Sequence, residues 1–440
     1  MSKRVRNYEQ FQDMLARLYP EFHRSKDDKK NYLCRTFTFQ VTDACNLACT
    51  YCYQINKGQR RMSLDIAKMA IDQLLTGDKN MSSYINKDES PGIVIEFIGG
   101  EPFMEIELID QIVDYFTHRM LELNHPWLTK FMISICSNGV LYSDPRVQKF
   151  LHKHRNRISF SITIDGNKEL HDSCRVFHDG SPSYDIAVTG AKDWISKGYY
   201  MGSKITIAPE NLEYIYDAIV HMISLGYLEI NANCVYEKGW EQHHATEYYY
   251  LLKKISDYFI ENNLQDKVYL SLFEEFMFTK KSETELENWC GGTGSMLAVD
   301  PDGNYYPCIR YMESSLGDSR EPFRIGNVYD GIAACQRHQD CINCLNNITR
   351  RSQSTDECFY CPIAEGCSWC SAYNYQENGT PDKRVTYICE MHKARALANK
   401  YYWQNYYNKN NIDKKYQLNV PDEWALKIIP KEELEMLKSL

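Results

Sequence analysis

Three cysteines, Cys45, Cys49 and Cys52, lie in one short stretch and are separated by three and then two residues. Thiols at this spacing fit on one tight loop and can bind three corners of a cubane iron–sulfur cluster, which normally takes four cysteine ligands. The fourth iron is then open to a substrate or cofactor. A zinc site is the alternative, but zinc ligands usually come as two short paired steps, and no histidine or fourth cysteine lies near Cys52.

Two glycines follow the second predicted strand, in the sequence Gly99-Gly100-Glu101-Pro102. Glycines at a strand end let the backbone approach a ligand closely, although such turns are common after strands. The cysteine stretch, with Tyr51 before its last cysteine, resembles the signature of the radical S-adenosylmethionine (radical SAM) superfamily, and the glycine turn matches the family's GGEP motif. This resemblance implies a [4Fe-4S] cluster whose open iron is chelated by S-adenosylmethionine, with the turn binding the methionine amino group.

The resemblance implies further cofactor contacts at the ends of later strands. Ser137 and Asn138 follow the third predicted strand, where the family places polar contacts to the ribose, although Asn-Gly is also an ordinary turn. Arg175 would pair with the carboxylate of S-adenosylmethionine, and a surface ion pair with Asp172 is the alternative. Ser161 and Asp165 alternate with apolar residues and are expected to face the barrel lumen or its mouth, whereas we expect His171 to be structural. The predicted cofactor-binding residues are Gly99, Gly100, Glu101, Pro102, Ser137, Asn138, Ser161, Asp165 and Arg175, and no catalytic residue is assigned.

Ten of the seventeen cysteines fall between Cys290 and Cys389. Clustered thiols need a soft metal, because free thiolates repel one another and oxidise. Gly303 is predicted to form a hairpin turn that brings Cys290 and Cys308 together. The spacing resembles the SPASM extension of radical SAM enzymes, with one residue fewer between Cys367 and Cys370. The resemblance implies two auxiliary clusters, with ligands Cys290, Cys308 and Cys370 for cluster I and Cys358, Cys361, Cys367 and Cys389 for cluster II.

Cluster I then has only three assigned ligands. Its fourth iron is either open, where it could bind a substrate thiolate, or closed by one of Cys335, Cys341 and Cys344. These three cysteines could also form a small separate zinc or cluster site. With the first loop, the predicted cofactors are S-adenosylmethionine and three [4Fe-4S] clusters.

The order of predicted elements indicates an α/β fold. Apolar strands at 34–41, 93–98, 131–137, 158–164, 201–207 and 228–233 alternate with helical patterns, which implies a parallel sheet with right-handed crossovers. A partial (β/α)6 barrel is the expected closure, with the site at the carboxyl ends of the strands. The expected divisions are an N-terminal arm at 1–33, the barrel at 34–235, a helical connector at 236–289, the SPASM domain at 290–395 and a C-terminal tail at 396–440.

Composition narrows the environment and the partners. The chain of 440 residues is 43% hydrophobic, and its start shows neither a signal peptide nor a transmembrane span. Many cysteines without a secretory signal are typical of metal ligation in a reducing cytosol. The net charge of −9 argues against a nucleic-acid partner, and we expect no membrane association.

The resemblance implies a peptide-modifying oxidoreductase of the cytoplasm. The leading prediction is a maturase that abstracts a hydrogen from a ribosomally synthesised precursor peptide and installs an oxidative crosslink, such as a thioether. The stretch 361–374 also looks like that of maturases for cysteine-repeat peptides. An electron donor such as flavodoxin or ferredoxin would be needed. About forty residues precede Cys45, too few for a leader-binding domain, so leader recognition would use the barrel, the tail after Lys400 or a separate protein.

Three alternatives remain at this stage. Anaerobic sulfatase-maturating enzymes carry an aspartate base directly after the cysteine that corresponds to Cys308, but this chain has Ile309. A peptide epimerase or a carbon–carbon crosslinking maturase would share the cofactors. A binding scaffold without turnover is the third, and the turn at 99–102 speaks against it.

Overall fold

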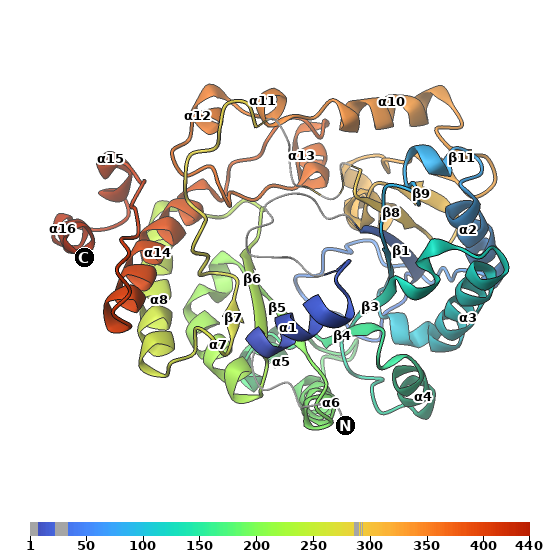
Figure 1. Cartoon of the computed structure of the whole chain (residues 1–440), viewed down its shortest axis with the longest axis horizontal. Coiled ribbons are helices and arrows are strands. Elements are labelled where there is room, and N and C mark those ends of the chain that lie inside the picture. The colour runs from blue at the N-terminus through green and yellow to red at the C-terminus, as the bar shows by residue number, and fades with distance from the viewer. Residues whose placement is uncertain (1–7, 23–33, 286–289, 291, 293) are drawn as a thin grey trace.

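The computed structural model describes residues 8–22, 34–285, 290, 292 and 294–440. Four parallel strands form the first part of the barrel, and helices cover their outer face (Figure 1). The strands are β1 (Arg35–Thr42), β2 (Ile93–Gly99), β3 (Phe131–Ser137) and β4 (Ile158–Ile162). The helices that connect and follow them are α2 (Leu64–Thr76), α3 (Ile106–Glu122), α4 (Pro145–His154), α5 (Lys168–Cys174) and α6 (Tyr184–Ser196).

The remaining barrel strands belong to a second parallel sheet. It contains β5 (Gly202–Ile207), β6 (Glu229–Cys234) and the short β7 (Tyr269–Leu270), with α7 (Ile215–Ser224) between β5 and β6. β4 and β5 contact each other without a hydrogen-bonded ladder. The predicted α/β fold with six alternating strands is therefore confirmed, and its sheet is open between the fourth and fifth strands.

Local sequence explains the helices and the side of the sheet that they cover. The Ser63 side chain accepts a hydrogen bond from the Ile66 amide at the start of α2, and Gly77 adopts the left-handed conformation that ends it. Along β2, Ile93, Ile95 and Phe97 are buried against the helices, whereas the alternate side chains are partly exposed on the opposite face.

The cysteine-rich region extends the barrel sheet. Strand β8 (Met296–Val299) pairs in parallel with β1, with Phe37 opposite Leu297, and β9 (Asn304–Tyr306), β10 (Gly326–Asn327) and β11 (Gly331–Ile332) follow in antiparallel order. Gly303, with φ of 84°, lies in the turn between β8 and β9. The expected boundary near residue 290 is therefore no break in the hydrogen-bonded sheet.

Helices build the rest of the C-terminal half. α8 (Gln242–Glu261) packs along α14 (Cys389–Lys409), and the tail helices lie at their outer edge (Figure 1). The Thr246 hydroxyl donates to the Ile428 carbonyl at 2.7 Å, and Lys253 pairs with Glu433 at 2.6 Å, so the tail is fixed to α8. The other helices are α9 (Glu313–Leu316), α10 (Gln336–Asn346), α11 (Arg350–Gln353), α12 (Asp356–Phe359), α13 (Ser371–Asn378), α15 (Asp422–Ala425) and α16 (Lys431–Ser439).

The N-terminal arm contains helix α1 (Tyr8–Leu18), while the rest of it at 1–7 and 23–33 lies outside the described residues. The Tyr19 hydroxyl donates to the Asn156 carbonyl, and Glu21 pairs with Lys130 at 3.5 Å. The end of the arm therefore contacts the segments that enter β3 and β4. Among the described residues, no helix combines the length and apolar character needed to cross a membrane.

The shared sheet predicts that the barrel and the cysteine-rich region lose stability together. Leu297 is fully buried, so Leu297→Ala should lower the free energy of unfolding by about 2–5 kcal/mol. Urea denaturation measures this change, and hydrogen exchange should quicken in β1 as well as in β8. The control is Leu426→Ala, whose side chain is 50% exposed, with an expected change within about 0.5 kcal/mol. Unchanged protection of β1 in Leu297→Ala would contradict the coupling.

Candidate functional site

The first cysteine loop follows β1 and is fixed by main-chain hydrogen bonds. The Ala48 amide donates to the Val176 carbonyl at 2.8 Å, and the Thr50 amide donates to the Cys174 carbonyl at 2.9 Å. The Leu47 amide points at the Cys45 sulfur at 3.4 Å. These bonds hold the three thiols on one turn at the carboxyl end of the first strand.

The glycine turn lies directly against this loop. The Gly100 amide donates to the Thr42 carbonyl at 3.1 Å, and the Glu101 amide donates to the Ala44 carbonyl at 3.0 Å. A Cβ atom on Gly100 would come within 2.4 Å of the Ala44 carbonyl oxygen and 2.6 Å of the Cys45 Cβ atom. Because those neighbours include rigid backbone, only glycine fits at this position.

Glu101 joins the ends of the second and third strands. Its buried carboxylate accepts hydrogen bonds from the Phe103 amide at 3.1 Å, the Ser137 hydroxyl at 2.8 Å and the Asn138 amide at 2.8 Å. Burial raises the pKa of Glu101, and these hydrogen bonds oppose that rise. The Glu101 side chain is therefore engaged with protein groups, so a ligand at this turn would meet backbone atoms.

Asn138 extends from that junction to the cysteine loop. Its side-chain amide donates to the Asn46 side-chain oxygen at 2.6 Å and lies 3.9 Å from the Cys45 sulfur. Pro102 is buried as the first residue of the turn of helix that follows. Ser161, on β4, is only half-buried, and within the described residues its side chain forms no hydrogen bond that would link it to this group.

A buried ion pair completes the site. The Arg175 Nε donates to the Asp165 carboxylate at 2.7 Å, the Arg175 Nη1 lies 3.8 Å from the Cys49 sulfur, and the Tyr51 hydroxyl also donates to Asp165. Although burial opposes the charged form, the Asp165 carboxylate and neighbouring groups hold the pKa of Arg175 well above its usual value. Arg175 is thus a fixed cation beside the first cysteine loop.

The alternative partner of Arg175 is excluded. Asp172 instead accepts hydrogen bonds from the Ser183 and Tyr184 amides, at 3.0 and 2.8 Å, where α6 begins. His171 is fully buried, its Nδ1 accepts from the Asp165 amide at 3.4 Å, and burial lowers its pKa to about 4. His171 therefore supports the segment that carries Arg175.

The donor set around the first loop fits a cluster of thiolate ligands. N–H groups from Leu47, Arg175 and Asn138 face the sulfurs, and such hydrogen bonds stabilise and tune cysteine-bound iron. Among the described residues, no three ligating side chains converge tightly enough to hold a single metal ion. A cubane places each thiol on a different iron, so its ligands are spaced more widely than those of one ion.

Seven of the ten thiols in the C-terminal region form two groups. Burial raises the pKa of Cys308. The nearby charges of Cys370 and Cys290 raise it further. A Cβ atom on Gly292 would lie 3.3 Å from the Cys308 sulfur and 3.7 Å from the Cys290 sulfur. The second group contains Cys358, Cys361, Cys367 and Cys389. Charges of other members of the group raise the pKa values of Cys361, Cys367 and Cys389. The two groups have the memberships expected for the auxiliary clusters, whose ligation stays a prediction.

The remaining three cysteines of this region, Cys335, Cys341 and Cys344, lie at α10. Burial raises the pKa of Cys341; among the charges acting on it, Arg337 has the largest effect and lowers it, and Cys344 and Cys335 raise it. The expectation that cluster I keeps an open iron stays a prediction.

Sequence reasoning missed a polar patch on the face of the sheet opposite the helices. The Glu96 carboxylate accepts from the Thr38 hydroxyl at 2.7 Å, and burial raises the pKa of Glu96 while the charge of Lys204 opposes the rise. Loss of solvation raises the pKa of Tyr53, and the charges of Cys52 and Glu96 raise it further. Glu96 is the single charged residue in an otherwise apolar strand, and this was the signal that could have identified it.

Arg310 connects this patch to the C-terminal thiols. Its guanidinium lies 5.8 Å from the centre of the Tyr53 ring and pairs with Glu237 at 3.1 Å. The charges of Cys370 and Cys308 help to raise its pKa. The loop of the first cluster and the region of the first auxiliary group therefore meet at Tyr53 and Arg310.

The tight contact at Gly100 gives a direct test of the site. Gly100→Ala should lower the free energy of unfolding by about 1–3 kcal/mol, because the new methyl group meets backbone that cannot move away. Iron bound per chain should fall as well, since the strain acts on the Cys45 loop. Gly202→Ala is the control, because its nearest neighbour would be 3.6 Å away. Equal stability and iron content in both variants would contradict the contact.

Comparison with known proteins places the chain in a family. The 4Fe-4S single cluster domain family matches residues 34–174. An uncharacterised protein of Methanocaldococcus jannaschii is 31% identical over 271 residues, which cover 61% of this chain and 82% of that protein. The serine-type anaerobic sulfatase-maturating enzyme of Bacteroides thetaiotaomicron is 21% identical over 377 residues, which cover 80% and 85%.

Solved structures share the fold. Native anSMEcpe with bound AdoMet and the Kp18Cys peptide has a TM-score of 0.59 at 18% identity, over 86% of this chain and 99% of that chain. Streptococcus suis SuiB bound to the precursor peptide SuiA has a TM-score of 0.54 at 14% identity, over 81% and 76%. The cysteine loop, the glycine turn packed on it and the cysteine-rich region that continues its sheet agree with these similarities, and the chain belongs to the radical SAM enzymes with a SPASM-type extension.

Proposed function

We propose that this chain is a radical SAM maturase that abstracts a hydrogen from a ribosomally made peptide and forms an oxidative crosslink, most simply a thioether. The carrying observation is that thiols gather on the barrel loop and, beyond it, in two groups of the C-terminal region that match the expected auxiliary ligands. Hydrogen abstraction alone needs only the first. Two further clusters suit a reaction that also removes an electron from the substrate.

The chain's own residues would hold the cofactor in place. The turn at Gly99 and Gly100 would offer main-chain carbonyl oxygens as acceptors for an amino group, and the fixed guanidinium of Arg175 suits a carboxylate. Asn138 is placed to contact a ligand beside Cys45. These residues would hold and orient the cluster and S-adenosylmethionine, which would supply the radical chemistry that hydrogen abstraction needs.

Glu96 is suited to accept the proton that a crosslink releases. Formation of a thioether removes two hydrogens from the peptide: one leaves as a hydrogen atom from carbon, and the thiol gives up a proton while one electron is released. Glu96 lies on the polar face beside the Tyr53 end of the cysteine loop, and its raised pKa makes its carboxylate a better base at neutral pH. This assignment makes Glu96 the proposed general base.

Known relatives support a peptide or protein substrate, and they also supply a second candidate. Sulfatase-maturating enzymes are among the sequence relatives, and a structural neighbour binds a precursor peptide. Formylglycine formation therefore stays a candidate. Ile309 follows Cys308, where the resemblance to that family calls for an aspartate, and this difference favours the crosslinking maturase.

Mass spectrometry of a co-expressed precursor peptide tests the proposal. The purified enzyme, reduced without oxygen, should release 5′-deoxyadenosine and remove two hydrogens from the peptide for each crosslink. A variant in which alanine replaces Cys45, Cys49 and Cys52 should do neither. An aldehyde trapped by a hydrazide would instead show formylglycine formation. Unchanged mass with deuterium uptake from solvent would show epimerisation, and either result would refute the crosslinking reaction.

Replacement of Glu96 tests the proposed base. Glu96→Gln should keep 5′-deoxyadenosine release but slow crosslinking by about 10²–10⁴-fold, the usual contribution of a positioned base. Since the pKa of Glu96 is raised and the base must be ionised, the unaltered enzyme should lose crosslinking on acidification at a higher pH than an ordinary glutamate would cause. Crosslinking by Glu96→Gln should not show this loss of rate on acidification. Glu89→Gln, an exposed residue before β2, is the control, and equal rates for both variants would exclude the role.

A further inference from the structure

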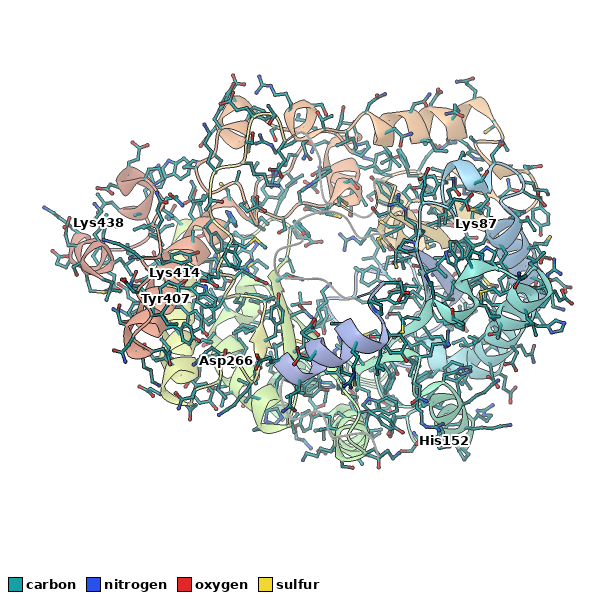
Figure 2. The ribbon with its side chains drawn as sticks, viewed as in Figure 1. Lys87, His152, Asp266, Tyr407, Lys414 and Lys438 are labelled. Atoms are coloured by element: carbon teal, nitrogen blue, oxygen red, sulfur yellow. The ribbon has the colours of Figure 1, made fainter. Side chains whose placement is uncertain are left out.

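A cavity of about 350 Å³ lies in the C-terminal tail, away from the cysteine groups. Its walls come from α14, from α16 and from the segment between α14 and α15, and three of its six residues are lysines. Figure 2 places Lys438 at the edge of the molecule that these helices form. The lining residues are Lys400, Lys415, Tyr416, Gln417, Leu418 and Lys438.

Positive charge in this cavity is not balanced. Lys400 is only 2% exposed, and its ammonium donates to the Tyr416 carbonyl at 3.1 Å and the Gln404 side-chain oxygen at 3.3 Å, both uncharged acceptors. Among the residues that the structure describes, no carboxylate forms an ion pair with Lys400 or Lys415, whereas Lys438 pairs with Asp422 at 2.6 Å. Burial and the charge of Lys415 lower the pKa of Lys400, so an anion bound in the cavity would favour the charged form of Lys400 and be attracted by it.

Unpaired backbone lies beside the lysines. The segment at 413–419 has neither helix nor strand structure, and within the described part of the chain the main-chain groups of Gln417 and Leu418 form no hydrogen bond. Open amides and carbonyls along an extended segment can pair with a peptide that adds as a strand. The site therefore offers main-chain pairing next to a cationic cavity.

The volume of the cavity favours a peptide over a free ion as its ligand. A cavity of about 350 Å³ is roughly ten times the share of liquid volume of one water molecule, about 30 Å³, so a lone carboxylate or phosphate would leave most of it unfilled. Tyr416, Leu418 and the methylene stems of the lysines supply apolar wall. These features fit an acidic side chain together with its apolar neighbours.

We propose that this cavity binds an acidic segment of the substrate peptide, with a carboxylate beside Lys400 and Lys415 and the peptide backbone along Gln417 and Leu418. The inference rests on the proposed peptide maturation and gives the C-terminal tail a role in substrate recognition. It places recognition outside the barrel, on elements fixed to α8.

Fluorescence anisotropy of the holoenzyme tests the site. The probe is a short dye-labelled peptide of alternating leucine and glutamate, compared with a peptide in which glutamine replaces glutamate. The glutamate peptide should bind at least about tenfold more tightly, and Lys415→Glu should remove that preference. Lys427→Glu is the matched control, because Lys427 is exposed in the same tail but does not line the cavity. Lys400→Met should weaken binding in the same direction.

Other outcomes would overturn the inference. Equal binding of both peptides, or equal loss in Lys415→Glu and Lys427→Glu, would exclude a specific carboxylate site. Displacement of the peptide by inorganic phosphate at low millimolar concentration would show an anion site instead. In crosslinking assays, Lys415→Glu should raise KM and leave kcat unchanged. Because binding is read without turnover, failure here with normal crosslinking would refute only the tail site, whereas no crosslinking by the unaltered enzyme would refute the proposed function.

Discussion

One buried carboxylate fixes the relative positions of the parts that meet at the first cysteine loop. Glu101 leaves the second strand and accepts hydrogen bonds from the start of the third connection, at Ser137 and Asn138. Its own amide is bonded to Ala44, one residue before Cys45. A buried carboxylate is costly unless its oxygens are satisfied, so the bonds around Glu101 must form together. The ends of three strands are thereby held in one arrangement, on which any ligand bound to the loop depends.

Most of the barrel could be predicted because parallel strands covered by helices read as apolar runs at regular intervals. Ser63 and Gly77 mark the two ends of α2 in the sequence as they do in the structure. The partner of β1 on its other side could not be predicted. The pairing of Phe37 with Leu297 depends on contacts between residues far apart in the chain. The sequence of a strand as short as β8 indicates a hairpin with β9 but not its second neighbour.

Site residues could be predicted where they belong to a short sequence motif. They could not be predicted where several similar residues could serve as the hydrogen-bond or ion-pair partner. Asp172 is near Arg175 in sequence, but α5 ends at Cys174, and the arginine turns toward Asp165 instead. Asp172 is then free to bind the first amides of α6. Glu96 was overlooked because its strand was read only for its apolar residues. The structure shows that the face of β2 opposite the helices is polar, because Thr38 bonds to Glu96 and Tyr53 lies close to it.

The position of β8 also affects how the chain folds during synthesis. β1 leaves the ribosome long before β8, so one of its edges receives its partner only after the barrel helices and α8 have been made. Long-range pairing of this kind slows folding, and an uncovered strand edge can pair with another chain in the meantime. The late arrival of β8 therefore leaves one edge of a nearly complete barrel open to pairing with another chain while translation continues.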